Sequence, residues 1–255
     1  MPASYAHYRF GRMVLSALPA SEKQCIQRFR RMFDMGLQGP DIFFFYNPLI
    51  KNFVAPLCAD YHRKSGAALF SAACAQAGSE AARAYLYGLL GHYCLDAACH
   101  PFIQQKANQG EANHVALEAE FDRYLLALDG EVAPHSWDMS PRLKLTRGEC
   151  MTVASFYPPV TGGKVSLSVR HMALLHKFAA GKNRPRTEAI LKKLKPGLQN
   201  GLIPASPVEA YARMDSELLA RFNRAVTRYP GLLEQLLAHM GTGEPLGEDF
   251  TPDFG

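Results

Sequence analysis

The sequence predicts an all-α protein, and three observations support this fold class. Apolar residues recur at helical spacing along nearly the whole chain. No pair of alternating apolar and polar runs is joined by a hairpin turn, and there is no heptad seam or internal repeat. The 255 residues, of which 48% are hydrophobic, are enough to bury a core. We therefore expect one multi-helix globular bundle over residues 1–255.

In the first part of the chain, proline and glycine mark the expected helix boundaries. The first helix should end before Pro19, and Ser21 is expected to cap the second, which runs to the glycine- and proline-rich stretch 36–40. Residues 41–60 contain two prolines and are predicted to form a structured loop.

Further along, His100-Pro101 should interrupt a helix, because proline disfavours helical backbone in the residue before it. A loop rich in Pro and Ser follows at 131–141, within a weak waist near 131–146. This waist would separate a metal-binding helical half, 1–130, from additional helices and an acidic tail in 131–255. Helices are predicted at about 4–18, 21–36, 62–77, 79–99, 112–129, 147–157, 164–180, 185–195 and 207–240.

Charge is unevenly distributed along the chain. The 28 Lys and Arg against 23 Asp and Glu give a net charge of +5, and basic residues concentrate in 182–195, whereas 241–255 is acidic. The basic region is a candidate for peripheral membrane or phosphate contact, and a solvated helix face is the alternative. Its residues are Lys182, Arg184, Arg186, Lys192, Lys193 and Lys195.

The sequence favours a cytoplasmic protein. The first residues lack the continuous apolar core of a signal peptide. No apolar run reaches the roughly 18–20 residues of a transmembrane segment. In a reducing compartment the six Cys should be free thiols.

The segment GHYCLDAACHP carries the strongest chemical signal. It places His92, Asp96 and His100 at successive i, i+4 positions, so that all three point to one side of a helix. A second pair with the same spacing, His114 and Glu118, follows on the next predicted helix. Two helices that each offer imidazole and carboxylate one turn apart can converge on a metal ion.

The alternative is that these residues form surface pairs, and the surroundings argue against it. The first group lies in AARAYLYGLLGHYCLDAACH, where almost nothing else is polar. A buried His and Asp without partners would cost several kcal/mol, on the order of 2–7 for each polar group. Cys94 and Cys99 flank this motif, either as zinc ligands or, as we favour, as small packing residues.

The order His…Asp…His…His-x-x-x-Asp…His…His-x-x-x-Glu resembles the zinc-dependent phospholipase C family and the related single-strand-specific zinc nucleases. The resemblance covers residues 1 to about 130 and implies an all-α enzyme with up to three Zn²⁺ in a cleft. It implies that one zinc is held by Asp41, His62, His92 and Asp96. Asp96 would bridge to a second zinc at His7, and a third would be held by His100, His114 and Glu118.

The amino terminus departs from the family pattern. Secreted relatives bind zinc through an amino-terminal Trp, whereas the only Trp here is Trp137. Met1 precedes Pro2, a context that favours removal of Met1, so the amine of Pro2 is a candidate replacement ligand beside His7. If Met1 is retained, its own amine is the alternative, or the zinc at His7 is weakly held.

The resemblance implies hydrolysis of a phosphodiester by metal-bound hydroxide. Zinc brings the pKa of bound water to about 7, and Asp41 could orient or deprotonate that water. We expect a phospholipid substrate ahead of nucleic acid. The alternatives are a zinc-dependent nuclease or nucleotidase, and a non-catalytic metal-stabilised helical binding module. No G-x-S-x-G elbow or phosphate-binding loop supports another hydrolase chemistry.

Residues near Asp41 are candidates for substrate contact. Phe44, Tyr46, Asn47 and Tyr61 could line a head-group pocket, although core packing is the alternative for the aromatic run. The remaining histidines are expected to be structural or at the surface. They are His135, His171, His176 and His239.

Overall fold

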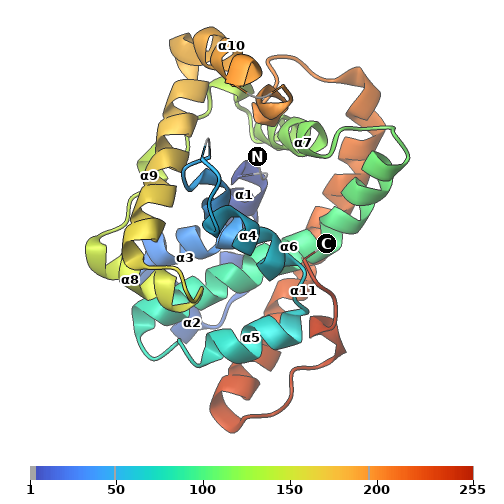
Figure 1. The fold of residues 1–255 in the computed structure, drawn as a ribbon. Coiled ribbons are helices and arrows are strands. Elements are labelled where there is room, and N and C mark those ends of the chain that lie inside the picture. Colours follow the sequence, from blue (N-terminus) through green and yellow to red (C-terminus); the bar gives the residue numbers. More distant parts are fainter. Residues whose placement is uncertain (1–3, 49, 195, 255) are drawn as a thin grey trace.

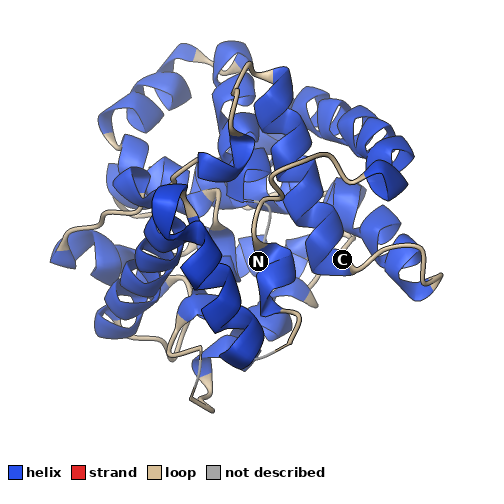
Figure 2. Cartoon of the chain, turned by 90° about the horizontal axis from the view of Figure 1, so that it is seen from above, coloured by secondary structure: helices blue, strands red, loops and turns tan. Residues whose placement is uncertain are grey.

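A computed structural model describes residues 4–48, 50–194 and 196–254 and confirms the all-α prediction. Figure 2 shows helices joined by loops, and no strand occurs among the described residues. The α-helices are α1 (Ser4–Val14), α2 (Ala20–Arg28), α3 (Arg30–Gly36), α4 (Val54–His62), α5 (Gly66–Cys74), α6 (Glu80–Asn108), α7 (His114–Leu128), α8 (Arg147–Ser155), α9 (Gly162–Ala179), α10 (Arg184–Leu194) and α11 (Ala212–Thr242). Short 3-10 helices are η1 (Leu15–Ala17), η2 (Gly39–Phe45), η3 (Pro134–Ser136), η4 (Ser140–Arg142), η5 (Gly181–Asn183), η6 (Leu198–Gly201), η7 (Glu209–Tyr211) and η8 (Glu248–Phe250).

Helix α6 is the centre of the bundle. It runs through the middle of the molecule (Figure 1) and packs against α1, α3, α7, α8 and α11. Gly36 of α3 and Gly88 of α6 let these two helices touch backbone to backbone. A Cβ atom at Gly88 would collide with the carbonyl oxygen of Phe33, and one at Gly36 with that of Tyr85. This close crossing fixes α6 against the amino-terminal helices.

The predicted second helix is divided in two, and its predicted cap is wrong. α2 begins at Ala20 with Pro19 as its N-cap, and the Ser21 hydroxyl donates to Glu22 instead of capping. The helix breaks at Phe29, whose backbone leaves the helical region (φ −116°, ψ 43°). α3 can then lie with Met32 and Phe33 fully buried in the core.

The prediction of a loop over 41–60 is wrong for most of its length, because η2 and α4 lie within it. Pro56 stands in the first turn of α4, where a missing N–H costs no helical hydrogen bond. The side-chain oxygen of Asn52 accepts from the N–H groups of Val54 and Ala55, at 2.9 and 3.1 Å, and so caps this helix.

The expected interruption at His100-Pro101 is also wrong, because α6 continues through Pro101 to Asn108. Proline removes one helical hydrogen bond. Beyond it, Phe102 and Ile103 are buried at 9% and 4% exposure, and this burial offsets the loss.

The carboxyl-terminal half follows the predicted helix boundaries within a few residues. α8 begins with a capping box, in which Thr146 and Glu149 bond each other's backbone N–H. The segment 131–146 contains η3 and η4, and its residues Met139 and Leu143 are buried in the core. In the part of the chain that the structure describes, no helix combines the length and hydropathy needed to cross a membrane.

Candidate metal centre

The structure brings together the side chains of eight residues that the sequence predicted as metal ligands. They come from α1, η2, α4, α6 and α7 and fall into groups whose potential ligand atoms lie within 4.8 Å of one another. The groups are His7, Asp41, His92 and Asp96; Asp41, Cys58 and His62; and His100, His114 and Glu118.

Asp96 lies at the middle of this cluster and faces two sets of histidines. Its Oδ2 is 3.1 Å from Nε2 of His92 and 3.7 Å from Nε2 of His62. Its Oδ1 is 3.2 Å from Nε2 of His7 and 3.7 Å from Nε2 of His100. The carboxylate therefore offers one oxygen to His62 and His92 and the other to His7 and His100.

Two further carboxylates complete the cluster. Oδ1 of Asp41 lies 3.1 Å from Nε2 of His62. Oε1 of Glu118 lies 3.2 Å from Nε2 of His100 and 3.4 Å from Nε2 of His114. The side chain of His114 is 33% exposed, so the cluster is most open at this end.

Backbone carbonyl groups orient three of the imidazoles. Nδ1 of His62 lies 2.7 Å from the carbonyl of Cys58, Nδ1 of His92 lies 3.2 Å from that of Leu37, and Nδ1 of His100 lies 2.8 Å from that of Phe254. Because a carbonyl only accepts, each Nδ1 must be the protonated nitrogen. In the neutral ring, Nε2 then keeps its lone pair for a metal ion.

Several buried polar atoms of the cluster have no hydrogen-bond partner among the described residues. They include Nε2 of His92 and Oδ2 of Asp96, which lie 3.1 Å apart but form no hydrogen bond, and Nδ1 of His7. Unpaired buried atoms of this kind each cost about 1–3 kcal/mol. The imidazole and carboxylate set suits Zn²⁺, and coordination would satisfy the atoms of His92 and Asp96.

The pKa values show how strongly the carboxylates attract positive charge. Burial alone would lower the pKa of His62, but Asp41 and Asp96 raise it to about 9. Burial is likewise outweighed at His100, where Asp96 and Glu118 raise the pKa to about 10. At His92 burial prevails and lowers the pKa to about 4.

The carboxylates themselves are held ionised. Burial opposes ionisation of Glu118, yet His100 and His114 lower its pKa to about 2. Burial also opposes ionisation of Asp96, and the neighbouring imidazoles hold the pKa of this carboxyl far below its usual range. The cluster is thus a buried anionic site that needs protons or metal cations to balance it.

Local structure places two of the ligands. Gly39 turns the chain ahead of Asp41 with φ +52°, and a Cβ there would lie 2.5 Å from the imidazole of His92. Asp122 of α7 accepts from the N–H groups of Tyr5 and Ala6, at 3.0 and 2.8 Å, and so caps the first turn of α1. This bond fixes the helix that carries His7 against the helix that carries Glu118.

Cys58 and Phe254 belong to the surroundings of the cluster but were not predicted from the sequence. The Cys58 thiol donates to Oδ1 of Asp41 at 3.6 Å. Its i, i+4 spacing to His62 is a signal that the sequence did contain. Phe254 carries no such signal, because it acts through its backbone and lies far from every other cluster residue in the sequence.

The predicted substrate contacts are placed differently from one another. Phe44 is 46% exposed, and its ring stacks on His62 with centroids 6.4 Å apart. Tyr61 is buried and its hydroxyl donates to the carbonyl of Pro158. Tyr46 and Asn47 are half-buried in the segment that follows η2. The predicted ligand Pro2 lies outside the described residues, as does Met1.

Cys94 and Cys99, which flank the motif in the sequence, lie outside the three groups. All six Cys are free thiols, and Cys94 and Cys99 are buried in the core.

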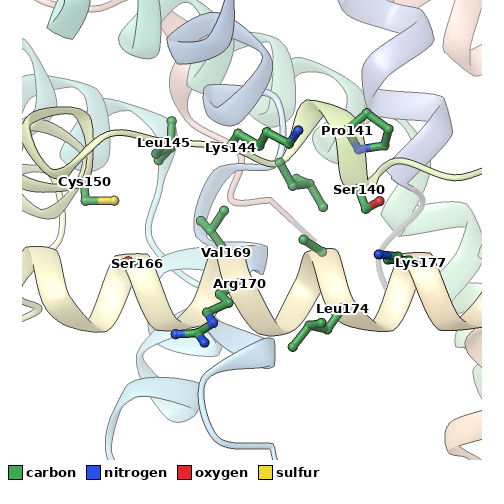
Figure 3. A pocket seen from close by; sticks show the side chains of 12 residues that line it. Ser140, Pro141, Lys144, Leu145, Cys150, Ser166, Val169, Arg170, Leu174 and Lys177 are labelled. Atoms are coloured by element: carbon green, nitrogen blue, oxygen red, sulfur yellow. The ribbon is translucent and has the colours of Figure 1, made fainter.

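A cavity of about 470 Å³ lies beside α9 (Figure 3). Its lining includes the basic residues Lys144, Arg170 and Lys177 and contains no member of the metal-ligating groups.

The chain matches the family described as zinc dependent phospholipase C over residues 6–155. This range is more than half of the chain and contains all eight clustered residues. No curated protein and no solved structure matches the chain.

Proposed function

The chain belongs to the zinc-dependent phospholipase C family, and from this membership we propose that it hydrolyses a phosphodiester, with a phospholipid as substrate. The observation that supports the proposal most is the buried cluster of five imidazoles and three carboxylates, all within the matched residues. It combines the ligand types of a zinc hydrolase with unpaired buried atoms at its centre.

The family resemblance suggests how zinc would be held, although among the groups of close atoms His7 is placed with His92, and His62 with Cys58. His62, His92 and Asp41 would hold one ion, with Oδ2 of Asp96. Oδ1 of Asp96 and His7 would hold a second, and the group of His100, His114 and Glu118 a third. When bound, zinc lowers the pKa of water toward neutrality and balances the negative charge of a phosphate ester.

Asp41 is the carboxylate that we assign to the chemistry. It is 3% exposed, and its Oδ1 accepts a hydrogen bond from the Cys58 thiol, which orients the carboxylate. Its carboxylate would orient the attacking water and accept its proton. Phe44 is 46% exposed, stacks on His62 and would contact the substrate, with Tyr46, Asn47 and Tyr61 as further candidates.

We propose that the basic region 182–195 contacts an anionic membrane. Among its described residues, Ile190 and Leu194 of α10 are about half exposed, at 47% and 51%, and Phe178 of α9 is exposed at 47%. Basic and apolar side chains on the same helices are typical of peripheral membrane surfaces.

The double variant Lys192→Glu, Lys193→Glu tests this contact. It should bind anionic vesicles more weakly than the unmodified chain and neutral vesicles equally well. Unchanged binding of the variant to anionic vesicles would contradict the contact.

Metal analysis tests the first part of the proposal. Protein purified without chelator should contain up to three zinc ions per chain, and His92→Ala should lower this number. His239→Ala serves as the control, because His239 lies outside the cluster. Iron in place of zinc, or no bound metal, would contradict a zinc hydrolase.

Activity on a chromogenic phosphodiester tests the second part. We expect Asp41→Asn to reduce the rate by about 10²–10⁴-fold, the usual effect of losing a general base. Because Asp41 is also a proposed zinc ligand, the zinc content of this variant is measured beside its rate, and the rates are compared per bound zinc. Comparison of a short-chain phosphatidylcholine with single-stranded DNA then distinguishes a lipase from a nuclease. Zinc binding with no hydrolysis of either would instead indicate a binding module.

A further inference from the structure

The segment after α11 returns across the molecule and is firmly held. Phe250 is fully buried, and its ring stacks on Tyr93 with centroids 5.9 Å apart. The Tyr93 hydroxyl donates to the carbonyls of Asp249 and Pro252, each at 3.1 Å. The N–H of Gly66 donates to the same Pro252 carbonyl at 2.9 Å. The segment itself lies outside residues 6–155, which the family matches.

Phe254, at the end of this segment, contacts the metal cluster directly. Its N–H donates to the carbonyl of His62 at 3.0 Å, and its carbonyl accepts from Nδ1 of His100 at 2.8 Å. Its ring is fully buried, with its centroid 5.3 Å from that of His62 and 5.6 Å from that of His92. One residue thus joins histidines from α4 and α6.

We propose that the segment Glu248–Phe254 belongs to the metal centre. Within it, Phe254 acts as a positioning residue for His62 and His100. The inference rests on the proposed zinc function. Its physical basis is that a carbonyl bound to Nδ1 fixes both the tautomer and the orientation of an imidazole ligand.

The structure also indicates which part of the centre depends on this segment. The carbonyls that orient His62 and His92 belong to Cys58 and Leu37, within the family-matched residues. The carbonyl that orients His100 belongs to Phe254 alone. Loss of the segment should therefore release zinc first from the group of His100, His114 and Glu118.

A shortened chain that ends at Thr251 tests this. It should fold with nearly normal helicity but bind one zinc about 10–100-fold more weakly in chelator competition, which is the usual effect of losing an outer partner of a ligand. Zinc at His62 and His92 should be weakened less, because the carbonyls that orient these two imidazoles belong to Cys58 and Leu37. Equal zinc affinity in the shortened and full chains would overturn the proposal.

Two ring variants provide a matched comparison if the shortened chain does not fold. Phe254→Ala and Phe250→Ala each remove a fully buried ring from the same segment, but only Phe254 contacts cluster histidines. Phe254→Ala should weaken zinc binding more than Phe250→Ala. Equal weakening would show a general effect of lost packing and overturn the positioning role.

A measurement without metal separates this inference from the proposed function. In zinc-free protein with ¹⁵N-labelled histidine, the NMR signals of His100 should show a proton on Nδ1, and this proton should lose its protection in the shortened chain. An unchanged His100 signal would overturn the inference. Absence of zinc from the full chain would instead overturn the zinc function.

Discussion

At the scale of single residues, Gly39 controls the placement of His92. It adopts the left-handed backbone conformation, with φ +52°, and its Cα hydrogen faces the imidazole ring. Any other residue at this position would have a strained backbone, and its Cβ would collide with the ring of His92. The glycine is therefore required twice, once for its conformation and once for the space beside the ligand.

We expect Gly39→Ala to destabilise the fold and also to reduce zinc binding. The left-handed backbone alone costs a residue with a Cβ about 1–2 kcal/mol. Gly130→Ala is the control, because Gly130 has φ +89° but nothing within 4 Å of its Cβ position. Both variants should lower the free energy of unfolding, and only Gly39→Ala should lose zinc. Normal zinc content in Gly39→Ala would contradict the role assigned to this glycine.

Asp215 of α11 gives a pH prediction away from the metal cluster. It is 2% exposed, and burial together with nearby Glu120 raises its pKa to about 7, against the opposing effect of Arg123. The folded state therefore binds the proton more tightly than the unfolded state. This contribution to stability is complete below about pH 4 and is lost as pH rises through 7.

Asp215→Asn should remove this dependence. Relative to the unmodified chain, its free energy of unfolding should rise between pH 5 and pH 8, by about 1–3 kcal/mol. Denaturant unfolding at both pH values measures the effect, with Asp60→Asn, at an exposed carboxyl, as the control. A constant difference between Asp215→Asn and the unmodified chain would contradict the prediction.

At the scale of elements, the crossing of α3 and α6 sets the position of the main ligand helix. Gly88 lies one helical turn before His92, and it allows the backbone of α6 to contact that of α3. A shift of α6 away from α3 would also move His92, Asp96 and His100, because all three are on this helix.

We expect Gly88→Ala to destabilise the protein by about 1–3 kcal/mol, the usual cost of overpacking. Gly231→Ala, within α11, is the matched control because its Cβ would meet no atom within 4 Å. The free energy of unfolding of Gly231→Ala should rise by about 0.5–1 kcal/mol, since alanine is the better helix former. Urea unfolding measures the stability of both variants. An unchanged free energy of unfolding in Gly88→Ala would show that α3 and α6 can separate at little cost.

Elements also show where sequence patterns were sufficient. The helices α7, α8, α9 and α10 begin and end close to the predicted positions, because capping residues and helical periodicity are local signals. Pro56 and Pro101 misled the prediction for the opposite reason. Whether proline ends a helix depends on its position in the first turn and on the burial of the residues beyond it.

At the scale of the whole molecule, the metal centre connects distant parts of the chain. Its candidate ligands come from α1, η2, α4, α6 and α7, and Phe254 adds the carboxyl-terminal segment. The buried residues of both halves belong to one hydrophobic cluster. We propose on this basis that residues 1–255 unfold as a single domain, as the sequence predicted.

Removal of zinc tests this proposal. Zinc that binds only the folded state stabilises it by about 4 kcal/mol at 1,000 times its Kd. Chelation should therefore lower the melting temperature of the whole protein in one transition, and added zinc should restore it. Calorimetry would contradict a single domain if it showed two transitions of which only one responded to zinc.

The sequence by itself determined the fold class, the family resemblance and the candidate ligands that the fold brings together. The sequence contains the ligand types and their i, i+4 spacing directly. In a helix, residues at this spacing lie on the same face. Only the tertiary structure decided which groups orient these ligands. The carbonyls of Leu37 and Phe254 and the cap provided by Asp122 act across long sequence separations. Backbone carbonyls are the same in every residue, so no sequence pattern could mark them.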